Sequence, residues 1–481
     1  MPGLMTDPAR ADLLARADRL LGQGNLRDAI DAYRGALADG GGPADAWYNL
    51  AWAERGDGRF HDALASYAKA IALGMDRPEE AMLNRAAILT EQLFDPTRAA
   101  EELDTALRLN PGFVLAWLNL GTIHEDLGAV EAARGAYHRA LALDPANGRA
   151  RARLGAIDIA TGNAAQAASD LRNALGTTQA YEDRAEILFS LGAALDEQAD
   201  YAAAFQAYEA ANQHARAIAR ARYDPRAHEA LVDRIIATFP TPIAPRAAAD
   251  DSRPIFICGM FRSGSTLAEQ ILGRHSAITA AGELDAIPML ARNLQPYPES
   301  VPALGDDRAA RLRQDYLEAL PGPGLVTDKR CDNFLHIGLI KTLFPDARII
   351  HTRRNALDNI LSVYFLYFGD AITYSHDLAE IAHYYSQYAR LMRHWQALYP
   401  DDIHTLDYDA LVDQPRQVIE SALTFLGLPW EDGCLAAGNT DAIRTASAWQ
   451  VRKPLHARSS GRWQHYEAQL AAIRPLLPAG D

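Results

Sequence analysis

Residues 254–266 read P-I-F-I-C-G-M-F-R-S-G-S-T. The first five form an apolar run typical of a buried parallel strand, and L-A-E-Q-I-L-G-R-H at 267–275 is typical of a helix. Between them, Gly259 and Gly264 have the spacing of a phosphate-binding P-loop. A strand, a glycine loop and a helix N-terminus together favour a bound anion, because backbone N–H groups and the helix dipole face the loop. The stretch therefore predicts an α/β fold with an anion site.

This loop departs from the nucleotide triphosphatase pattern at one position. The lysine that would reach the β- and γ-phosphates is replaced by Ser265, and Arg262 lies inside the loop instead. We also find no apolar run ending in an aspartate that would hold Mg²⁺. A donor with a shorter anionic tail, such as a phosphosulfate, fits this loop better. A P-loop kinase that binds Mg·ATP is the least supported alternative.

A second phosphate-binding element is predicted in D-A-R-I-I-H-T-R-R-N-A-L-D-N-I-L-S-V-Y-F, residues 346–365. The pattern indicates a strand, then two arginines, then a helix. We expect Arg354 and Ser362 to converge on one further phosphate. Strands expected at 254–258, 325–327 and 347–352, set between helices, indicate a parallel sheet.

The first half of the chain is a repeat array. Residues 116–145, A-W-L-N-L-G-T-I-H-E-D-L-G-A-V-E-A-A-R-G-A-Y-H-R-A-L-A-L-D-P, place aromatic, small and proline residues at the offsets of the tetratricopeptide pattern. Small residues let two helices approach, and large ones fill the gap between repeats, so such units stack into a superhelix with a concave surface. We expect this surface to bind a protein or peptide. The six copies start near residues 10, 44, 80, 114, 148 and 185.

The domain limits follow from a proline-rich stretch, P-T-P-I-A-P-R-A-A-A-D-D-S-R-P, at 240–254. We predict a repeat domain at 1–218, a helical segment and linker at 219–250, and a second domain at 251–481.

Composition and charge exclude several classes. The 481 residues carry a formal net charge of −15, which argues against non-specific binding of nucleic acid or anionic membranes. Three scattered cysteines suit a reducing compartment and have no metal-ligand spacing, so we expect no metal site. We see no signal peptide and no apolar run of about 20 residues, and we expect a soluble, cytoplasmic protein.

The second half resembles the sulfotransferase family, and most closely its repeat-containing bacterial members and the protein-tyrosine sulfotransferases. Four segments carry the resemblance: F-R-S-G-S-T-L, T-D-K-R-C-D-N-F at 327–334, R-N-A-L-D-N-I-L-S, and T-A-S-A-W-Q-V-R-K-P-L-H-A-R-S-S-G-R-W at 445–463. The resemblance implies a parallel α/β domain, the donor 3′-phosphoadenosine 5′-phosphosulfate and the product 3′,5′-bisphosphoadenosine. It assigns donor contacts to Arg262, Ser263, Gly264, Ser265, Thr266, Leu267, Arg354, Ser362, Ser447 and Arg462.

The same resemblance implies the catalytic residues. Lys329 is the cation expected near the transferring group, and Arg262 is expected at the 5′ end of the donor. Glu283, in A-A-G-E-L-D, is our candidate general base for an acceptor hydroxyl. The protein-tyrosine enzymes have a G-E-E stretch with the base at the second carboxylate, where this chain has Leu284. Asp285 therefore stays open as an alternative base.

Three readings of the whole chain remain. The first is a sulfotransferase whose repeats recruit a protein or peptide acceptor. The second is a carbohydrate or small-alcohol sulfotransferase whose repeats serve docking or dimerisation. The third is a catalytically inactive scaffold that binds partners through its repeats. The sequence leaves the acceptor and a homodimer open.

Overall fold

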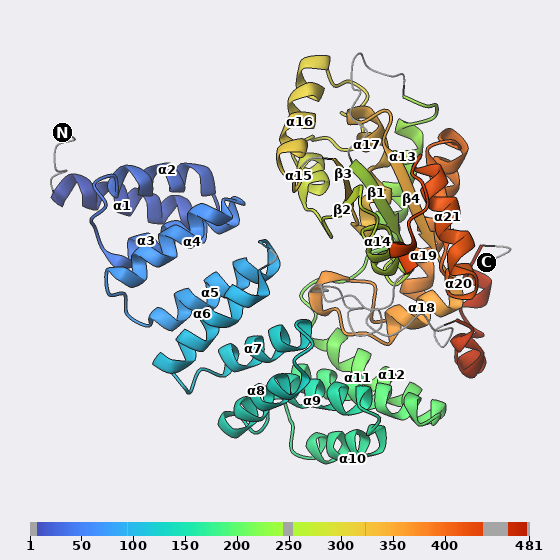
Figure 1. Cartoon of the computed structure of the whole chain (residues 1–481), viewed down its shortest axis with the longest axis horizontal. Coiled ribbons are helices and arrows are strands. Elements are labelled where there is room, and N and C mark those ends of the chain that lie inside the picture. The colour runs from blue at the N-terminus through green and yellow to red at the C-terminus, as the bar shows by residue number, and fades with distance from the viewer. Residues whose placement is uncertain (1–6, 94, 244–253, 323, 436–459, 479–481) are drawn as a thin grey trace. The chain divides into compact units, whose positions relative to one another are not determined.

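The computed structural model describes residues 7–93, 95–243, 254–322, 324–435 and 460–478. Packing divides the chain into two compact units, the first ending at Thr178 and the second beginning at Gln179 (Figure 1). The limits 1–218 and 251–481 given above stay predictions of domain boundaries, whereas this division describes which helices pack together.

The first unit is built from helix hairpins, each joined by a short turn (Figure 1). Its described helices are α1 (Asp7–Gly22), α2 (Leu26–Ala36), α3 (Ala44–Gly56), α4 (Phe60–Ala72), α5 (Pro78–Glu91), α6 (Pro96–Leu109), α7 (Val114–Asp126), α8 (Val130–Leu143), α9 (Gly148–Ala160) and α10 (Ala164–Leu175).

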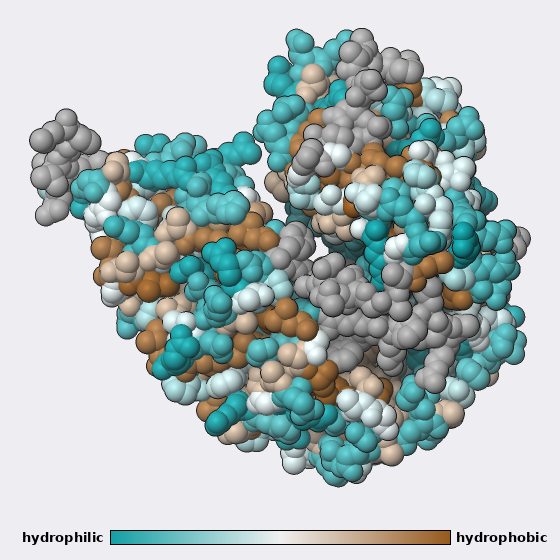
Figure 2. Space-filling model, in the orientation of Figure 1, coloured by the Kyte–Doolittle hydropathy of each residue, from teal (hydrophilic) through white to brown (hydrophobic). Residues whose placement is uncertain are grey.

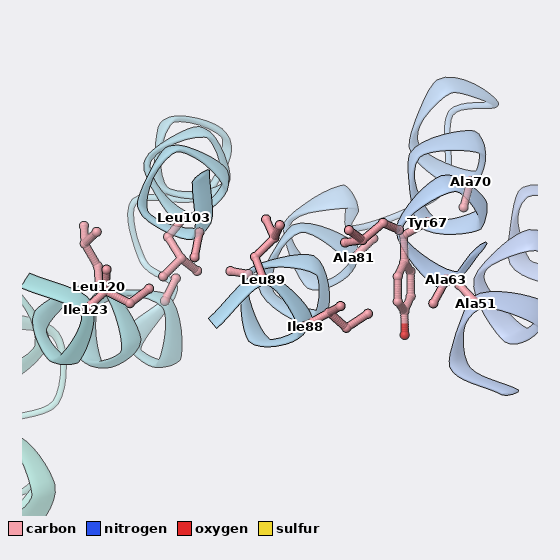
Figure 3. Packing of buried hydrophobic residues seen from close by; sticks show 14 of the residues in the cluster. Ala51, Ala63, Tyr67, Ala70, Ala81, Ile88, Leu89, Leu103, Leu120 and Ile123 are labelled. Carbon is pink, nitrogen blue, oxygen red and sulfur yellow. The ribbon is translucent and has the colours of Figure 1, made fainter. Parts of the chain in front are cut away.

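Small and large residues alternate in the core of this unit. Figure 3 shows Ala51, Ala63 and Tyr67 from neighbouring helices packed together, all fully buried. A Cβ added at Gly121 of α7 would lie 2.5 Å from the ring of Tyr137 in α8. Glycine is therefore required there, because the tyrosine ring fills the space that a side chain would occupy. The predicted repeat packing is confirmed.

The second unit begins with helices and continues into a sheet. The helices before the sheet are α11 (Tyr181–Glu197), α12 (Tyr201–Ile218) and α13 (Pro225–Thr238). The strands are β1 (Pro254–Gly259), β2 (Ile278–Ala280), β3 (Leu325–Asp328), β4 (Arg348–Arg353) and β5 (Ile403–Asp407). Further helices are α14 (Ser265–Leu272), α15 (Ala286–Arg292), α16 (Asp306–Glu318), α17 (Ile337–Leu343), α18 (Ala356–Tyr364), α19 (Leu378–Leu398), α20 (Tyr408–Asp413), α21 (Pro415–Phe425) and α23 (Glu467–Leu470).

The described strands form one parallel sheet in the order β2-β3-β1-β4-β5. All six residues of β1 are buried, as expected for a strand covered on both faces. Ile257 faces the apolar cluster shared with α14 and α21, whereas the ring of Phe256 lies 5.8 Å from that of Tyr316 in α16. The predicted combination of a repeat array with a parallel α/β domain is confirmed.

Because β1, β3 and β4 are parallel, their carboxyl ends meet at one edge of the sheet. In register, Gly259 of β1 pairs with Thr352 of β4, and Phe256 of β1 pairs with Asp328 of β3. Ligands of open α/β sheets bind at this edge. Within the described residues, no helix combines the length and the low polarity needed to cross a membrane.

Candidate functional site

The loop between β1 and α14 has the backbone that its glycines predict. Gly264, just before α14, has a φ of +97°, and an added Cβ would lie 2.5 Å from Cδ2 of Tyr408. At Gly259, an added Cβ would lie 2.3 Å from the carbonyl oxygen of Thr352. Both positions exclude larger residues by close approach, and Gly264 also by conformation. The loop is thus held tightly between β4 and α20.

Two loop hydroxyls contact the protein around the loop. Oγ of Ser263 lies 2.7 Å from Oγ1 of Thr352, and Oγ of Ser265 lies 3.3 Å from Sγ of Cys331. These bonds fix the loop against β4 and against the segment after β3. Both serines were expected at the donor, and in the structure their side chains support the loop.

The start of α14 forms the end of the loop that is suited to an anion. Backbone N–H groups in the first turn of a helix lack intrahelical carbonyl partners and carry the positive end of the helix dipole. Here the amide of Ala268 donates to the carbonyl of Gly264 at 3.0 Å, which closes the first turn around the loop. Thr266 is buried, and Leu267 packs against the apolar cluster beneath the helix.

Two arginines meet at this loop. Nε of Arg262 donates to Oγ of Ser362 at 3.1 Å, and Arg262 has a φ of +71°, uncommon for a non-glycine residue. The guanidinium of Arg354 lies 4.9 Å from the ring centre of Tyr408. Arg354 is 7% exposed. The pKa of Arg262 is lowered to about 10, mainly by burial and to a smaller extent by the positive charge of Arg354. Burial also lowers the pKa of Arg354. Because the charge of Arg354 acts on Arg262, an anion bound near both would offset their repulsion.

Polar residues of α18 hold the loop and were not singled out from the sequence. Nδ2 of Asn359 donates to the carbonyl of Phe261 at 3.1 Å. Asn355 caps α18 by accepting a bond from the amide of Asp358 at 3.2 Å. Both lie inside the motif R-N-A-L-D-N-I-L-S, whose density of asparagine and aspartate in a helix was a signal for such contacts.

Asp358 of α18 holds the start of the C-terminal segment. It accepts bonds from the amides of Gly461 at 2.6 Å and Trp463 at 2.8 Å. The side chain of Arg462, between these two residues, pairs with Asp196 of α11 at 2.9 Å. Ser447, also expected at the donor, lies outside the described residues.

The predicted base and cation contact each other. Nζ of Lys329 donates to Oε1 of Glu283 at 2.6 Å, with the lysine side chain 1% exposed and the glutamate side chain 42% exposed. The Gly282 peptide fixes this pair, since its carbonyl accepts from the amide of Lys329 at 2.7 Å and its amide donates to Glu269 at 2.9 Å. Burial alone would lower the pKa of Lys329, but the neighbouring Cys331 and Glu283 outweigh it and raise that pKa.

The alternative base lies in a different ion pair. Asp285 accepts from Nη1 of Arg330 at 2.6 Å, and its side chain is 68% exposed. Arg330 also pairs with Asp332 at 2.7 Å. Asp285 therefore lies further into solvent than Glu283 and away from the buried lysine.

Two buried carboxyl groups lie behind the lysine. Glu269 of α14 accepts from Oγ1 of Thr327 at 2.7 Å, and Asp328 accepts from the hydroxyl of Tyr316 at 3.0 Å. Burial raises the pKa of Glu269 above its usual value and raises that of Asp328 to about 7. No group of three histidine, cysteine or carboxylate side chains suited to a metal occurs in the described part of the chain.

The structure thus gathers two clusters at one sheet edge. Arg262, Arg354 and Ser362 form the first, and Lys329 with Glu283 forms the second. Cys331 links them, since its sulfur lies 3.3 Å from Oγ of Ser265 in the loop and it follows Lys329 by two residues. This arrangement can bind an anionic group at the loop and place a carboxylate and an ammonium group beside it.

Family models match both parts of the chain. Residues 254–432 match the model of the sulfotransferase family, and residues 14–78 and 85–148 match the tetratricopeptide repeat model. The chain combines a sulfotransferase-family domain with tetratricopeptide repeats. The first match supports sulfuryl transfer as the general reaction, and the repeats indicate protein–protein interaction.

Individual proteins cover parts of the chain. An uncharacterised protein of Aquifex aeolicus (strain VF5) is 34% identical over 323 residues, which are 62% of this chain and 42% of that relative. The chain thus spans about two fifths of the length of the curated relative that it matches. The crystal structure of MamA is 22% identical with a TM-score of 0.33, over 36% of this chain and 92% of MamA. YrrB, described as a TPR protein with an unusual peptide-binding site, is 21% identical with a TM-score of 0.29, over 40% of this chain and 89% of YrrB.

Proposed function

We propose that the protein transfers the sulfuryl group of 3′-phosphoadenosine 5′-phosphosulfate to an acceptor hydroxyl, on a protein or peptide that the repeats recruit. The observation that carries the proposal is the pair of clusters at one sheet edge. Arg262 and Arg354 lie at the glycine loop, and the buried Lys329 holds Glu283 at 2.6 Å beside it. Buried positive charge fits a donor with phosphate groups at both ends of the nucleoside.

The residues divide the chemistry between them. The loop amides and Arg262 hold the 5′-phosphosulfate, and Arg354 with Ser362 holds the 3′-phosphate. Glu283 accepts the proton of the acceptor hydroxyl as its oxygen bonds to sulfur. The bond between sulfur and the bridging oxygen breaks, and its electron pair stays on the 5′-phosphate of the product. Lys329 stabilises the charge that develops there.

The repeats support a protein or peptide acceptor. Large apolar side chains are exposed along them, and Figure 2 shows apolar patches among polar ones over the first unit. Contiguous exposed apolar patches of this kind are typical of interaction surfaces. The exposed side chains include Trp52, Leu73, Leu109, Leu115, Leu127 and Leu143.

Calorimetric titration with 3′,5′-bisphosphoadenosine tests the donor. We expect binding by the wild type, and affinity about 10-fold weaker in Arg354→Ala and in Ser362→Ala, because each loses a bond to phosphate worth roughly 1.4 kcal/mol. Arg353→Ala is the matched control, since it removes the same charge from the adjacent, exposed position. It should change the affinity by about twofold or less.

The same titration with ATP and Mg²⁺ is the competing measurement. Absent binding of the bisphosphate, or tighter binding of Mg·ATP, would remove the sulfotransferase proposal and favour a kinase or a scaffold.

An acceptor screen tests the second part of the proposal. Peptides with tyrosine, serine or threonine, oligosaccharides and small alcohols are each incubated with labelled donor. We expect labelled peptides. Label found in sugars or alcohols alone would contradict recruitment of a protein acceptor.

A further inference from the structure

The helix pair α11–α12 packs against the sulfotransferase-family domain within the second unit. Nδ2 of Asn212 in α12 donates to the carbonyl of Tyr364, the last residue of α18, at 2.9 Å. The ring of Tyr208 stacks on that of Phe365 with centroids 3.9 Å apart and planes inclined by 10°. This helix pair therefore contacts the end of the helix that carries Ser362.

One side chain from the C-terminal segment reaches this helix pair. Nε of Arg462 donates to Oδ1 of Asp196 at 3.3 Å, and Nη2 lies 2.9 Å from Oδ2, so one edge of the guanidinium meets both carboxylate oxygens. The guanidinium also lies 5.0 Å from the ring centre of Phe365. Tyr466 donates its hydroxyl to the same carboxylate. The pair is largely shielded, with side chains 26% and 17% exposed.

The backbone of Arg462 is fixed to the donor-site helix. Asp358 accepts bonds from the amides on both sides of Arg462, and Asp358 and Ser362 are four residues apart on α18. Residues at this spacing share one helix face. Ser362 accepts from Arg262, so the same face holds both arginines, and their charges repel each other and Arg354.

We propose that Asp196 is a positioning residue for the donor site, acting through Arg462, so that α11 forms part of this site. The inference rests on the proposed function, because it takes the donor's phosphates as the ligand. Asp196 engages Nε and Nη2 of the guanidinium, and the hydroxyl of Tyr208 bonds to the same group, so α11 and α12 together hold it in place. Asp196 fixes the plane of the group before the donor binds, which lowers the entropy lost on binding. It also offsets the repulsion among three arginines in the free site.

Titration of the full chain with 3′,5′-bisphosphoadenosine tests this role. The deciding result is whether replacing Asp196 weakens or strengthens the binding. Removing a carboxylate should strengthen the binding of a polyanion if charge alone matters. We expect Asp196→Ala to weaken binding about 5-fold instead, because Arg462 loses its fixed orientation. The isosteric Asp196→Asn, which keeps the volume of the side chain, should weaken it less.

A double-mutant cycle tests whether Asp196 acts on donor binding through Arg462. In an Arg462→Ala background, Asp196→Ala should have no further effect, because the residue through which it acts is gone. Glu380→Ala is the matched control, since Glu380 pairs with Arg216 at 2.8 Å and joins the same helix pair to α19 outside the donor site. It should leave the affinity unchanged, whatever it does to thermal stability.

The outcomes separate the two proposals. Unchanged or tighter binding in folded Asp196→Ala and Asp196→Asn, or equal losses with and without Arg462, overturns the positioning role and leaves the donor assignment intact. Absent binding by the wild type overturns both.

Discussion

At the scale of single residues, the two candidate bases have different partners. Glu283 contacts Lys329, whereas Asp285 lies against Arg330 and is more exposed. Lys329 directly follows β3, so its contact with Glu283 places this carboxylate at the sheet edge where the glycine loop also begins.

Glu283→Gln should lower kcat by about 100-fold or more, the usual contribution of a general base. Affinity for 3′,5′-bisphosphoadenosine should stay within about twofold. Rates of labelled sulfuryl transfer measure the first quantity, and calorimetry measures the second. Asp285→Asn is the matched control, with kcat expected within about threefold of the wild type. A large loss of kcat in Asp285→Asn with little change in Glu283→Gln would make Asp285 the base.

Asp328 predicts a pH dependence of stability. Burial raises its pKa from the usual 3.8 to about 7, so between these values the native state binds a proton that the unfolded state has lost. Stability therefore falls as pH rises from about 4 to about 7, and the loss is complete above pH 7. The loss of unfolding free energy due to Asp328 is at most roughly 4 kcal/mol.

In Asp328→Asn this dependence should disappear. The difference in unfolding free energy between variant and wild type should grow in favour of the variant from pH 4 to 7, measured by denaturant titration. Tyr316→Phe keeps the carboxyl buried but removes a bond that lowers the pKa of Asp328, so the fall in stability should persist and extend to higher pH. Parallel pH profiles for Asp328→Asn and the wild type would refute this account.

At the scale of one element, the loop between β1 and α14 depends on its glycines. Its backbone is set by close approach, since an added Cβ at Gly264 meets Tyr408, and the same ring lies under Arg354. We therefore expect a change in the loop to reach Arg354 through the ring of Tyr408.

Gly264→Ala should weaken binding of 3′,5′-bisphosphoadenosine by about 10-fold or more, because both the positive φ and Tyr408 oppose the methyl group. Gly427→Ala is the matched control. Gly427 also has a positive φ of 73°, but nothing lies within 4 Å of an added Cβ. It should cost about 1 kcal/mol of stability and leave binding unchanged. Equal losses of affinity in the two variants would mean that backbone strain alone matters.

At the scale of the whole molecule, the division of the chain lies inside the repeat array. Helices α11 and α12 follow the tetratricopeptide pattern, yet they belong to the second unit, where Asn212 bonds to Tyr364 and Asp196 to Arg462. The sixth predicted repeat therefore has the sequence of an array member and the contacts of the second unit.

Truncation separates these roles. A chain of residues 179–481 should fold and bind 3′,5′-bisphosphoadenosine within about threefold of the full chain. A chain of residues 219–481 should lose cooperative unfolding and binding, because Phe365 loses its stacking partner Tyr208. Circular dichroism melts and calorimetry measure both. Full binding by the shorter chain would show that α11–α12 is dispensable.

The elements of this protein could be predicted from its sequence because their signals are local. Small and aromatic residues recur at fixed offsets in the repeats, and helix pairs form where these residues pack. An apolar run followed by two glycines fixes β1, its loop and α14, since only glycine fits at Gly264. The sheet edge that holds Arg354, Lys329 and Glu283 follows from parallel strands, whose carboxyl ends meet.

Only the tertiary structure decided which side chains meet. Arg262 contacts Ser362 across 100 residues, Lys329 contacts Glu283 across 46, and Arg462 contacts Asp196 across 266. The convergence of Arg354 and Ser362 on one phosphate stays a prediction, and the structure adds the bond from Arg262 to Ser362. Local patterns specify turns and periods because those depend on neighbours in the chain. The partner of a charged side chain depends instead on how separate elements pack, and no local spacing encodes that.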